Sequence, residues 1–131
     1  MDLPQPQALP HTSEAPRLAR RYLASRAAAW PAGFLDLVVL LTSELVTNAV
    51  VHGRRPVELR LTDDGGEITI EISDGDPDPL PAEAGRLPPV TQHNGRGLLV
   101  VDNLADQWGY RLHRTPPGKT VWFAMRYESA G

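Results

Sequence analysis

The chain has 131 residues, no cysteine and a formal net charge of -3. This length suits one domain with a single core and excludes a protein of several domains. The acidic balance argues against binding nucleic acid mainly through phosphate contacts, and the lack of cysteine excludes disulfides, thiolate metal sites and cysteine nucleophiles. No apolar run reaches about 20 residues and no secretory signal is visible, so we expect a cytoplasmic protein without a membrane span.

The prolines and the apolar periodicity divide the chain. Residues 1–12 form a proline-rich N-terminal segment in which "QALPH" could add an edge strand, residues 13–127 form the domain, and residues 128–131 are a tail. The pattern predicts a first helix from an N-cap at Ser13 to about Ala29, where "WPAG" breaks it.

A second helix is predicted from about Phe34 to Val51, ended by Gly53 in the left-handed conformation. "VELRLT" and "EITIEIS" alternate apolar and polar residues, and "DDGG" between them predicts a hairpin. Residues 75–94 show neither period and are expected to form a functional loop. "GRGLLVVDNLAD" predicts a short helix, and "QWGYRLHRT" and "TVWFAMRY" predict a closing hairpin. The fold class is therefore α+β, a two-layer sandwich with helices on one face of a mixed, mostly antiparallel sheet.

The segment "ELVTNAVVHG", residues 44–53, places two polar side chains on an apolar helix. At about 100° per residue, Glu44 and Asn48 lie about 40° apart and share an arc with Leu37 and Leu41. Both therefore point where burial is expected. The plain alternative is a solvent-facing stripe at the edge of the helix. If the face is buried, a bound ion, water or ligand explains a carboxylate that is otherwise costly there.

Asp74 has the same strand parity as Ile68, Ile70 and Ile72, so it is expected on the core side of the sheet. An Asx-turn after the strand is the plain alternative. A buried, ionised carboxylate beside Gly75 would instead accept a hydrogen bond from a ligand's amino group.

Gly95 and Gly97 stand at a helix start, where backbone N–H groups favour an anion such as phosphate. Glycines that only mark the boundary between a loop and a helix are an equally good explanation. No P-loop lysine motif is present. Lys119 in "GKT" is expected in a hairpin turn and lacks the spaced glycine that such a motif needs.

Taken in order, "ELVTNAVVHG", "ISDGD", "GRGLLVVDNLAD" and "GKTVWF" resemble the ATP-binding domain shared by histidine kinases, type II topoisomerases, mismatch-repair ATPases and heat-shock chaperones, the GHKL family or Bergerat fold. Within it, the stand-alone anti-sigma-factor serine/threonine kinases are most similar. The resemblance runs from the first helix to the last strand and implies ATP and Mg²⁺ as cofactors.

The resemblance also implies residue roles. Glu44 would be the general base, Asn48 would hold Mg²⁺ against the phosphates, and Asp74 would accept from the adenine amine. Residues 76–94 would form a lid over the phosphates, and Thr120 would support the adenine site through hydroxyl or water contacts. The implied nucleotide-binding set is Asn48, Asp74, Gly75, Gly95, Arg96, Gly97, Leu98 and Thr120.

Three functional hypotheses follow. The first is a regulatory protein of the anti-sigma-factor type, which binds a sigma factor and phosphorylates Ser or Thr of an antagonist protein with Mg-ATP. The second is a nucleotide-gated protein-binding module without turnover. The third is the catalytic fragment of a sensor histidine kinase, although no dimerisation helix with a phosphoacceptor histidine precedes the domain in the sequence. The partners would be proteins rather than nucleic acid or membrane, and a homodimer stays open.

Overall fold

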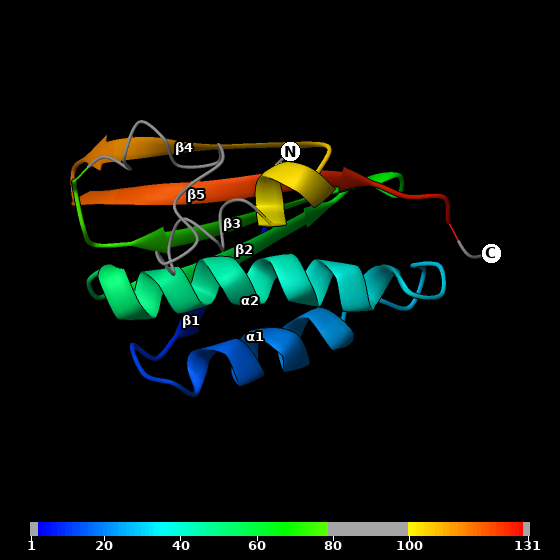
Figure 1. Cartoon of the computed structure of the whole chain (residues 1–131), viewed down its shortest axis with the longest axis horizontal. Coiled ribbons are helices and arrows are strands. Elements are labelled where there is room, and N and C mark those ends of the chain that lie inside the picture. Colours follow the sequence, from blue (N-terminus) through cyan, green and yellow to red (C-terminus); the bar gives the residue numbers. More distant parts are fainter. Residues whose placement is uncertain (1–2, 79–99, 130–131) are drawn as a thin grey trace.

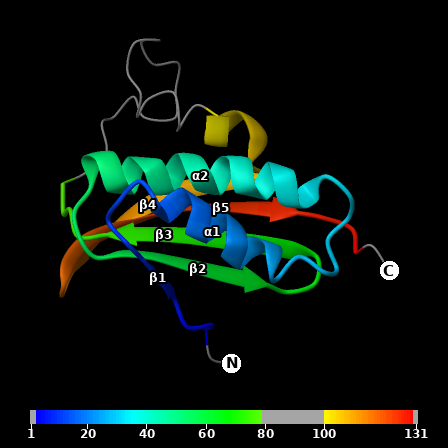
Figure 2. The same cartoon turned by 90° about the horizontal axis from the view of Figure 1, so that it is seen from below.

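The computed structural model describes residues 3–78 and 100–129. Their strands form one sheet in the order β1-β2-β3-β5-β4, and every neighbouring pair is antiparallel. Both long helices lie on the same face of this sheet, with α1 beside α2 (Figures 1 and 2). The elements are β1 (Gln7–Leu9), α1 (Ala15–Ala24), α2 (Phe34–His52), β2 (Val57–Asp63), β3 (Glu67–Asp74), β4 (Gln107–Arg114) and β5 (Pro117–Arg126).

The α+β sandwich is confirmed, and in the described residues the sheet is antiparallel throughout. The core lies between the helices and the sheet, because strands β2 and β3 alternate buried and part-exposed residues as their sequences predict. The edge strand expected from "QALPH" is also present, since β1 pairs with β2. The largest fully buried side chains include Leu23, Val38, Leu41, Leu59, Ile68, Ile70, Ile72 and Phe123.

The limits of α1 differ from the prediction. The helix begins at Ala15, and Ser13 is not its N-cap. Residues 12–15 form a turn instead. The carbonyl of Thr12 accepts the N–H of Ala15 at 3.0 Å, and the hydroxyl of Thr12 accepts the N–H of Glu14 at 3.2 Å. At the other end the hydroxyl of Ser25 donates to the carbonyl of Tyr22 at 2.6 Å, and the helix stops at Ala24, well before Ala29. A turn closed by the backbone carbonyl of Thr12 therefore precedes the first helical residue, and the side-chain bond of Ser25 lies at the end of the helix.

The prediction for α2 is confirmed with one residue added at its end. Gly33, with a φ of 84°, turns the chain into the helix. Gly53 ends it but has φ -94° and ψ -166°, so the expected left-handed conformation is wrong. Its N–H still donates to the carbonyl of Ala49 at 3.0 Å.

Helix α2 is, in the part of the chain that the structure describes, long and apolar enough to cross a membrane by length and composition. The expectation that no run has this length was therefore too strict. A core helix passes the same test, and α2 places Val38, Leu41, Leu45 and Val46 in the common core with the sheet.

The predicted β2–β3 hairpin is confirmed, and its turn is joined to the segment that precedes α2 and to the residue that follows β5. Asp63 accepts hydrogen bonds from Trp30 Nε1 at 2.9 Å, from the hydroxyl of Tyr127 at 2.7 Å and from the N–H of Gly65 at 2.9 Å. Burial alone would raise the pKa of Asp63, but these three bonds outweigh it and hold the pKa below its ordinary value. This carboxylate thus fixes one end of the sandwich.

Residues 100–104 are helical, which agrees with the end of the helix predicted from "GRGLLVVDNLAD", and Val101 is buried in the core. The closing hairpin of β4 and β5 is confirmed. Most of the expected loop at 75–94 and the whole "GRG" segment lie outside the described residues.

Candidate functional site

Asp74 ends β3 on the helix side of the sheet, as its parity predicts, and only 7 % of it is exposed. Its carboxylate lies against the end of α2. A Cβ on Gly53 would stand 2.6 Å from Asp74 Cγ and 2.7 Å from Oδ2, which is closer than real Cβ contacts come. A residue without a Cβ is therefore needed where the helix ends, and this explains the glycine better than a left-handed turn does.

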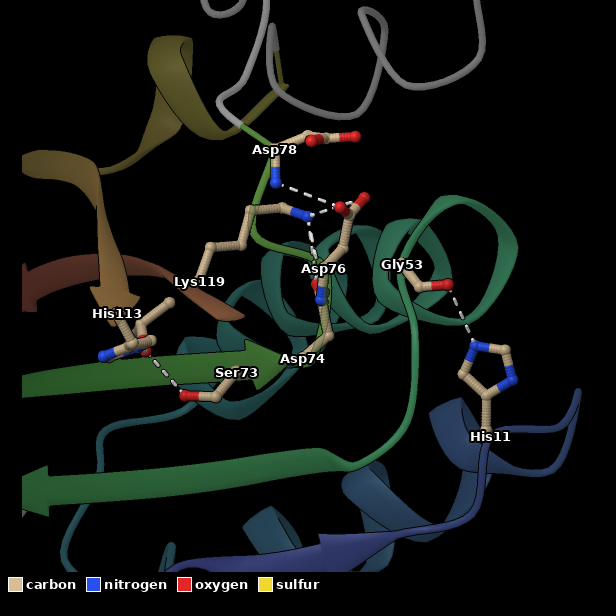
Figure 3. Close-up of polar contacts among 9 residues, drawn as sticks. His11, Gly53, Ser73, Asp74, Asp76, Asp78, His113 and Lys119 are labelled. Atoms are coloured by element: carbon tan, nitrogen blue, oxygen red, sulfur yellow. Dashed lines mark hydrogen bonds and ion pairs between the residues drawn. The ribbon is translucent and has the colours of Figure 1, made fainter. Parts of the chain in front are cut away.

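Lys119 is the cation that faces this carboxylate (Figure 3). Its Nζ lies 3.3 Å from Oδ2 of Asp74 and 3.4 Å from Oδ1, and both side chains are buried. The sheet dictates the pairing, because Asp74 and Lys119 are directly opposite in the β3–β5 register. No local pattern predicts this pairing, since the two residues are 45 positions apart.

Asp76 belongs to the same cluster. Its Oδ1 accepts the N–H of Asp78 at 3.0 Å, and its Oδ2 lies 3.6 Å from Lys119 Nζ. The hydrogen bond from Asp78 is the main cause that holds the pKa of Asp76 below its ordinary value, and the charges of Lys119 and Arg54 act in the same direction against partial burial. Two carboxylates therefore share one ammonium (Figure 3).

The Asx-turn considered for Asp74 is also present, because Oδ1 accepts the N–H of Asp76 at 2.7 Å. The turn and the buried acceptor are thus one arrangement rather than alternatives. The chain crosses tightly here: the N–H of Gly75 donates to the carbonyl of Arg54 at 2.7 Å, and a Cβ on Gly75 would overlap the carbonyl oxygen of Arg55. From the segment before α1, His11 Nε2 lies 3.3 Å from the carbonyl oxygen of Gly53 (Figure 3).

Glu44 and Asn48 are half-buried rather than inside the core. Each directly precedes a fully packed residue, Leu45 or Ala49, and a turn of about 100° per residue therefore puts them at the edge of the buried face of α2. At a rise of about 1.5 Å per residue, Asn48 lies about 7.5 Å and Glu44 about 13.5 Å along the axis from Gly53. The helix thus carries a carboxamide and a carboxylate in a line leading away from Asp74.

Thr120 lies on the other face of the sheet. It is opposite Ser73, whose side chain points away from the helices, and the two hydroxyl oxygens are 2.7 Å apart. His113 Nε2 lies 2.6 Å from Thr120 Oγ1, and this network lines a cavity of about 260 Å³. The Thr120 hydroxyl therefore points to the opposite face of the sheet from the Asp74 carboxylate, and Asp74 and Gly75 are also among the residues that line this cavity. Lys119 occupies the position directly beside the Asp74 carboxylate.

Of the other implied residues, Gly95, Arg96, Gly97 and Leu98 lie outside the described residues, as does the lid beyond residue 78. Within residues 3–78 and 100–129, no group of three or more His, Cys, Asp or Glu could hold a metal. Mg²⁺ at Asn48 would consequently need ligand phosphates and water for most of its coordination, which is how this ion is commonly bound.

Comparisons with known proteins agree with this architecture. Residues 6–125 match the family of histidine kinase-like ATPase domains. Among solved structures, the mycobacterial sensor histidine kinase MprB is similar, with 17 % sequence identity and a TM-score of 0.59 over 95 % of this chain and 98 % of that chain. At this identity the likeness shows the fold alone. A search of curated proteins found no match.

Proposed function

The chain belongs to the family of histidine kinase-like ATPase domains, and from that premise we propose an ATP-binding regulatory protein of the anti-sigma-factor type that phosphorylates Ser or Thr of an antagonist protein. Family membership suggests ATP binding and a regulatory role. The observation that carries the proposal is the buried carboxylate of Asp74 at the end of the helix on which Asn48 and Glu44 follow in line.

This arrangement suits a nucleotide laid along α2. The base would reach Asp74. When its carboxylate is ionised, it can accept hydrogen bonds but cannot donate them, so the base must present a donor such as an amino group. The phosphates would extend toward Asn48. When bound, Mg²⁺ would neutralise charge on the transferring phosphoryl group, and the neutral carboxamide oxygen of Asn48 is a suitable hard ligand for it.

Glu44 would act one helical turn further on. It would take the proton of the attacking Ser or Thr hydroxyl while the hydroxyl oxygen forms a new bond to the γ-phosphorus. The bond between the γ-phosphorus and the oxygen that bridges it to the β-phosphorus breaks, and ADP leaves with that oxygen. Its half-buried position leaves the carboxylate accessible to a partner's side chain. The proposed partners are a sigma factor, an anti-sigma-factor antagonist, or both.

The test uses radiolabelled ATP, Mg²⁺ and a panel of small antagonist domains from the same genome. The parent should label a Ser or Thr, and Glu44→Gln should lower that rate by roughly 100-fold or more while changing ATP affinity little, because Gln keeps size but cannot accept the proton. Asp36→Asn is the matched control, since it removes an exposed carboxylate from the first turn of the same helix.

Two outcomes would contradict the proposal. Equal labelling by the parent and Glu44→Gln would remove Glu44 as the base. No labelling across the panel, combined with capture of a partner from native lysate only when ATP and Mg²⁺ are present, would identify a nucleotide-gated binding module without turnover.

A further inference from the structure

Three neighbouring strands place three different chemistries side by side on the helix face of the sheet. Lys119 on β5 is directly opposite Asp74 on β3 and directly opposite Leu112 on β4. Directly opposed residues of antiparallel strands share a face. An acceptor, a donor and an apolar side chain therefore lie next to one another, and 47 % of Leu112 is exposed.

The next set of opposed residues continues the apolar part. Val121 follows Lys119 on the same face of β5, and Tyr110 of β4 is opposite it. Tyr110 is 41 % exposed, while Val121 is buried. An aromatic and an aliphatic side chain thus stand beside the charged pair, which is the kind of lining that accepts the face of a flat ring.

The contacts of the pair leave hydrogen-bonding capacity unused. An ionised carboxylate offers about four acceptor positions. Asp74 uses Oδ1 for the N–H of Asp76 and for Lys119, and Oδ2 for Lys119. One position is left for an incoming amine. Lys119 has three donors, and its described partners are Asp74 and Asp76 at 3.3 to 3.6 Å, which are long for charge-assisted hydrogen bonds.

We propose that Lys119 is a base-recognition residue: its ammonium donates to the ring nitrogen N1 of adenine while Asp74 accepts from the neighbouring 6-amino group. The inference rests on the proposed nucleotide binding. It adds to that proposal the residue that recognises N1, the hydrogen-bond acceptor of the base. An amine that bonds Asp74 from the side of Lys119 brings its neighbouring ring atom close to Lys119 Nζ, because that Nζ is 3.3 to 3.4 Å from both Asp74 oxygens.

The pair matches the edge of adenine, which presents a donor beside an acceptor. Guanine presents a carbonyl where adenine has the amine, so it would place an acceptor against the Asp74 carboxylate in this orientation. Lys119 also offsets the negative charges of Asp74 and Asp76 near an anionic ligand. The charge effect applies to every nucleotide, whereas the hydrogen bond to N1 applies only to a base that has this acceptor.

The test combines a variant with a base analogue and measures binding by calorimetry. ATP is compared with 1-deaza-ATP, in which a C–H replaces N1, on the parent and on Lys119→Met, which keeps an unbranched side chain without the ammonium. We expect the Met variant to bind ATP about 10- to 100-fold more weakly than the parent, as for a lost charge-assisted hydrogen bond. Because the Met variant also lacks the positive charge that offsets Asp74 and Asp76, its affinity for both ligands should fall. The loss of affinity for 1-deaza-ATP should be about 10-fold smaller than the loss for ATP.

Arg111→Met is the matched control. Arg111 is on β4 next to Leu112 but on the opposite face, where it pairs with Glu71. The substitution Arg111→Met removes one positive charge without changing the residues around the proposed base site. Its effects on the affinities for ATP and 1-deaza-ATP should therefore be equal. Lys119→Arg is a second variant that keeps the positive charge, and it can be measured in place of Lys119→Met if the Met variant does not fold.

Lys119 is the only lysine in the chain, which gives a direct readout on the parent protein. With ¹⁵N-labelled lysine, the single side-chain Nζ signal should shift when ATP is added and shift much less with 1-deaza-ATP. Equal shifts, or equal losses of affinity for both ligands in Lys119→Met, would overturn the role of Lys119 while leaving ATP binding intact. A parent that binds neither ligand would overturn both the inference and the proposed function.

Discussion

Gly53 packs its Cα directly against the carboxylate of Asp74, so the end of α2 and the end of β3 have no space for a side chain between them. Gly53→Ala would introduce a Cβ 2.6 Å from both Asp74 Cγ and the carbonyl oxygen of Ala49. We expect about 1–3 kcal/mol of lost stability from overpacking, together with weaker nucleotide binding as Asp74 is displaced. Denaturant unfolding and calorimetry measure the two effects.

Gly66→Ala is the control for this substitution, because the nearest atom to its Cβ would be Asp64 Oδ1 at 3.8 Å. If Gly53→Ala behaves like Gly66→Ala in both measurements, the close packing of Gly53 on Asp74 does not constrain the site.

Asp74 should set the preference for adenine over guanine nucleotides. Asp74→Asn replaces an acceptor by a group that can also donate, and it leaves Lys119 with Asp76 alone. ATP binding should weaken by a few kcal/mol at most, on the scale of a charge-assisted hydrogen bond, and the difference between ATP and GTP should shrink. Glu58→Gln, on the other face of β2, should change neither affinity. Equal affinities of the parent for ATP and GTP would remove Asp74 from this role.

Asn48 should make nucleotide binding depend on Mg²⁺. Asn48→Ala removes the carboxamide oxygen from the edge of α2 and should abolish the gain in ATP affinity that Mg²⁺ gives the parent, with the fold intact. Titration of ATP with and without Mg²⁺ measures this, and circular dichroism checks the fold. A variant that binds Mg-ATP as tightly as the parent would show that another group holds the metal.

The lowered pKa of Asp63 predicts a specific loss of stability in acid. Its hydrogen bonds to Trp30 and Tyr127 favour the ionised form, so the stabilisation is fully present above the ordinary value of 3.8 and is lost as the pH falls through the lowered folded pKa. Because Asp63 is partly exposed to solvent, Asp63→Asn should cost only about 0.5–1 kcal/mol near neutral pH. The difference in unfolding free energy between parent and variant should shrink below pH 3.8. A difference that stays constant down to pH 2 would contradict this.

Thr120 should matter more for stability than for nucleotide binding. Thr120→Val keeps the shape but removes the hydroxyl that contacts Ser73 and His113 on the face away from Asp74. We expect about 1–2 kcal/mol of lost stability and a change in ATP affinity of less than about 2-fold. A large loss of affinity without a loss of stability would return Thr120 to the adenine site.

The sequence determined the elements because their signals are local. Alternation with a period of two fixed which residues of β2 and β3 face the core, and through it the burial of Asp74. A long apolar run between Gly33 and Gly53 fixed α2, on which Glu44 and Asn48 lie one turn apart. Hydrogen bonds within a few residues were harder to predict, and the limits of α1 were wrong for that reason.

Tertiary structure decided which side chains meet. The register of β5 against β3 joins residues 45 positions apart, and a shift of one residue exchanges the two faces of a strand. That is why Lys119, rather than Thr120, stands beside Asp74. The edge position of Glu44 and Asn48 likewise depends on how α2 is rotated against the sheet, which is set by packing around Leu45 and Ala49 rather than by the helix sequence alone.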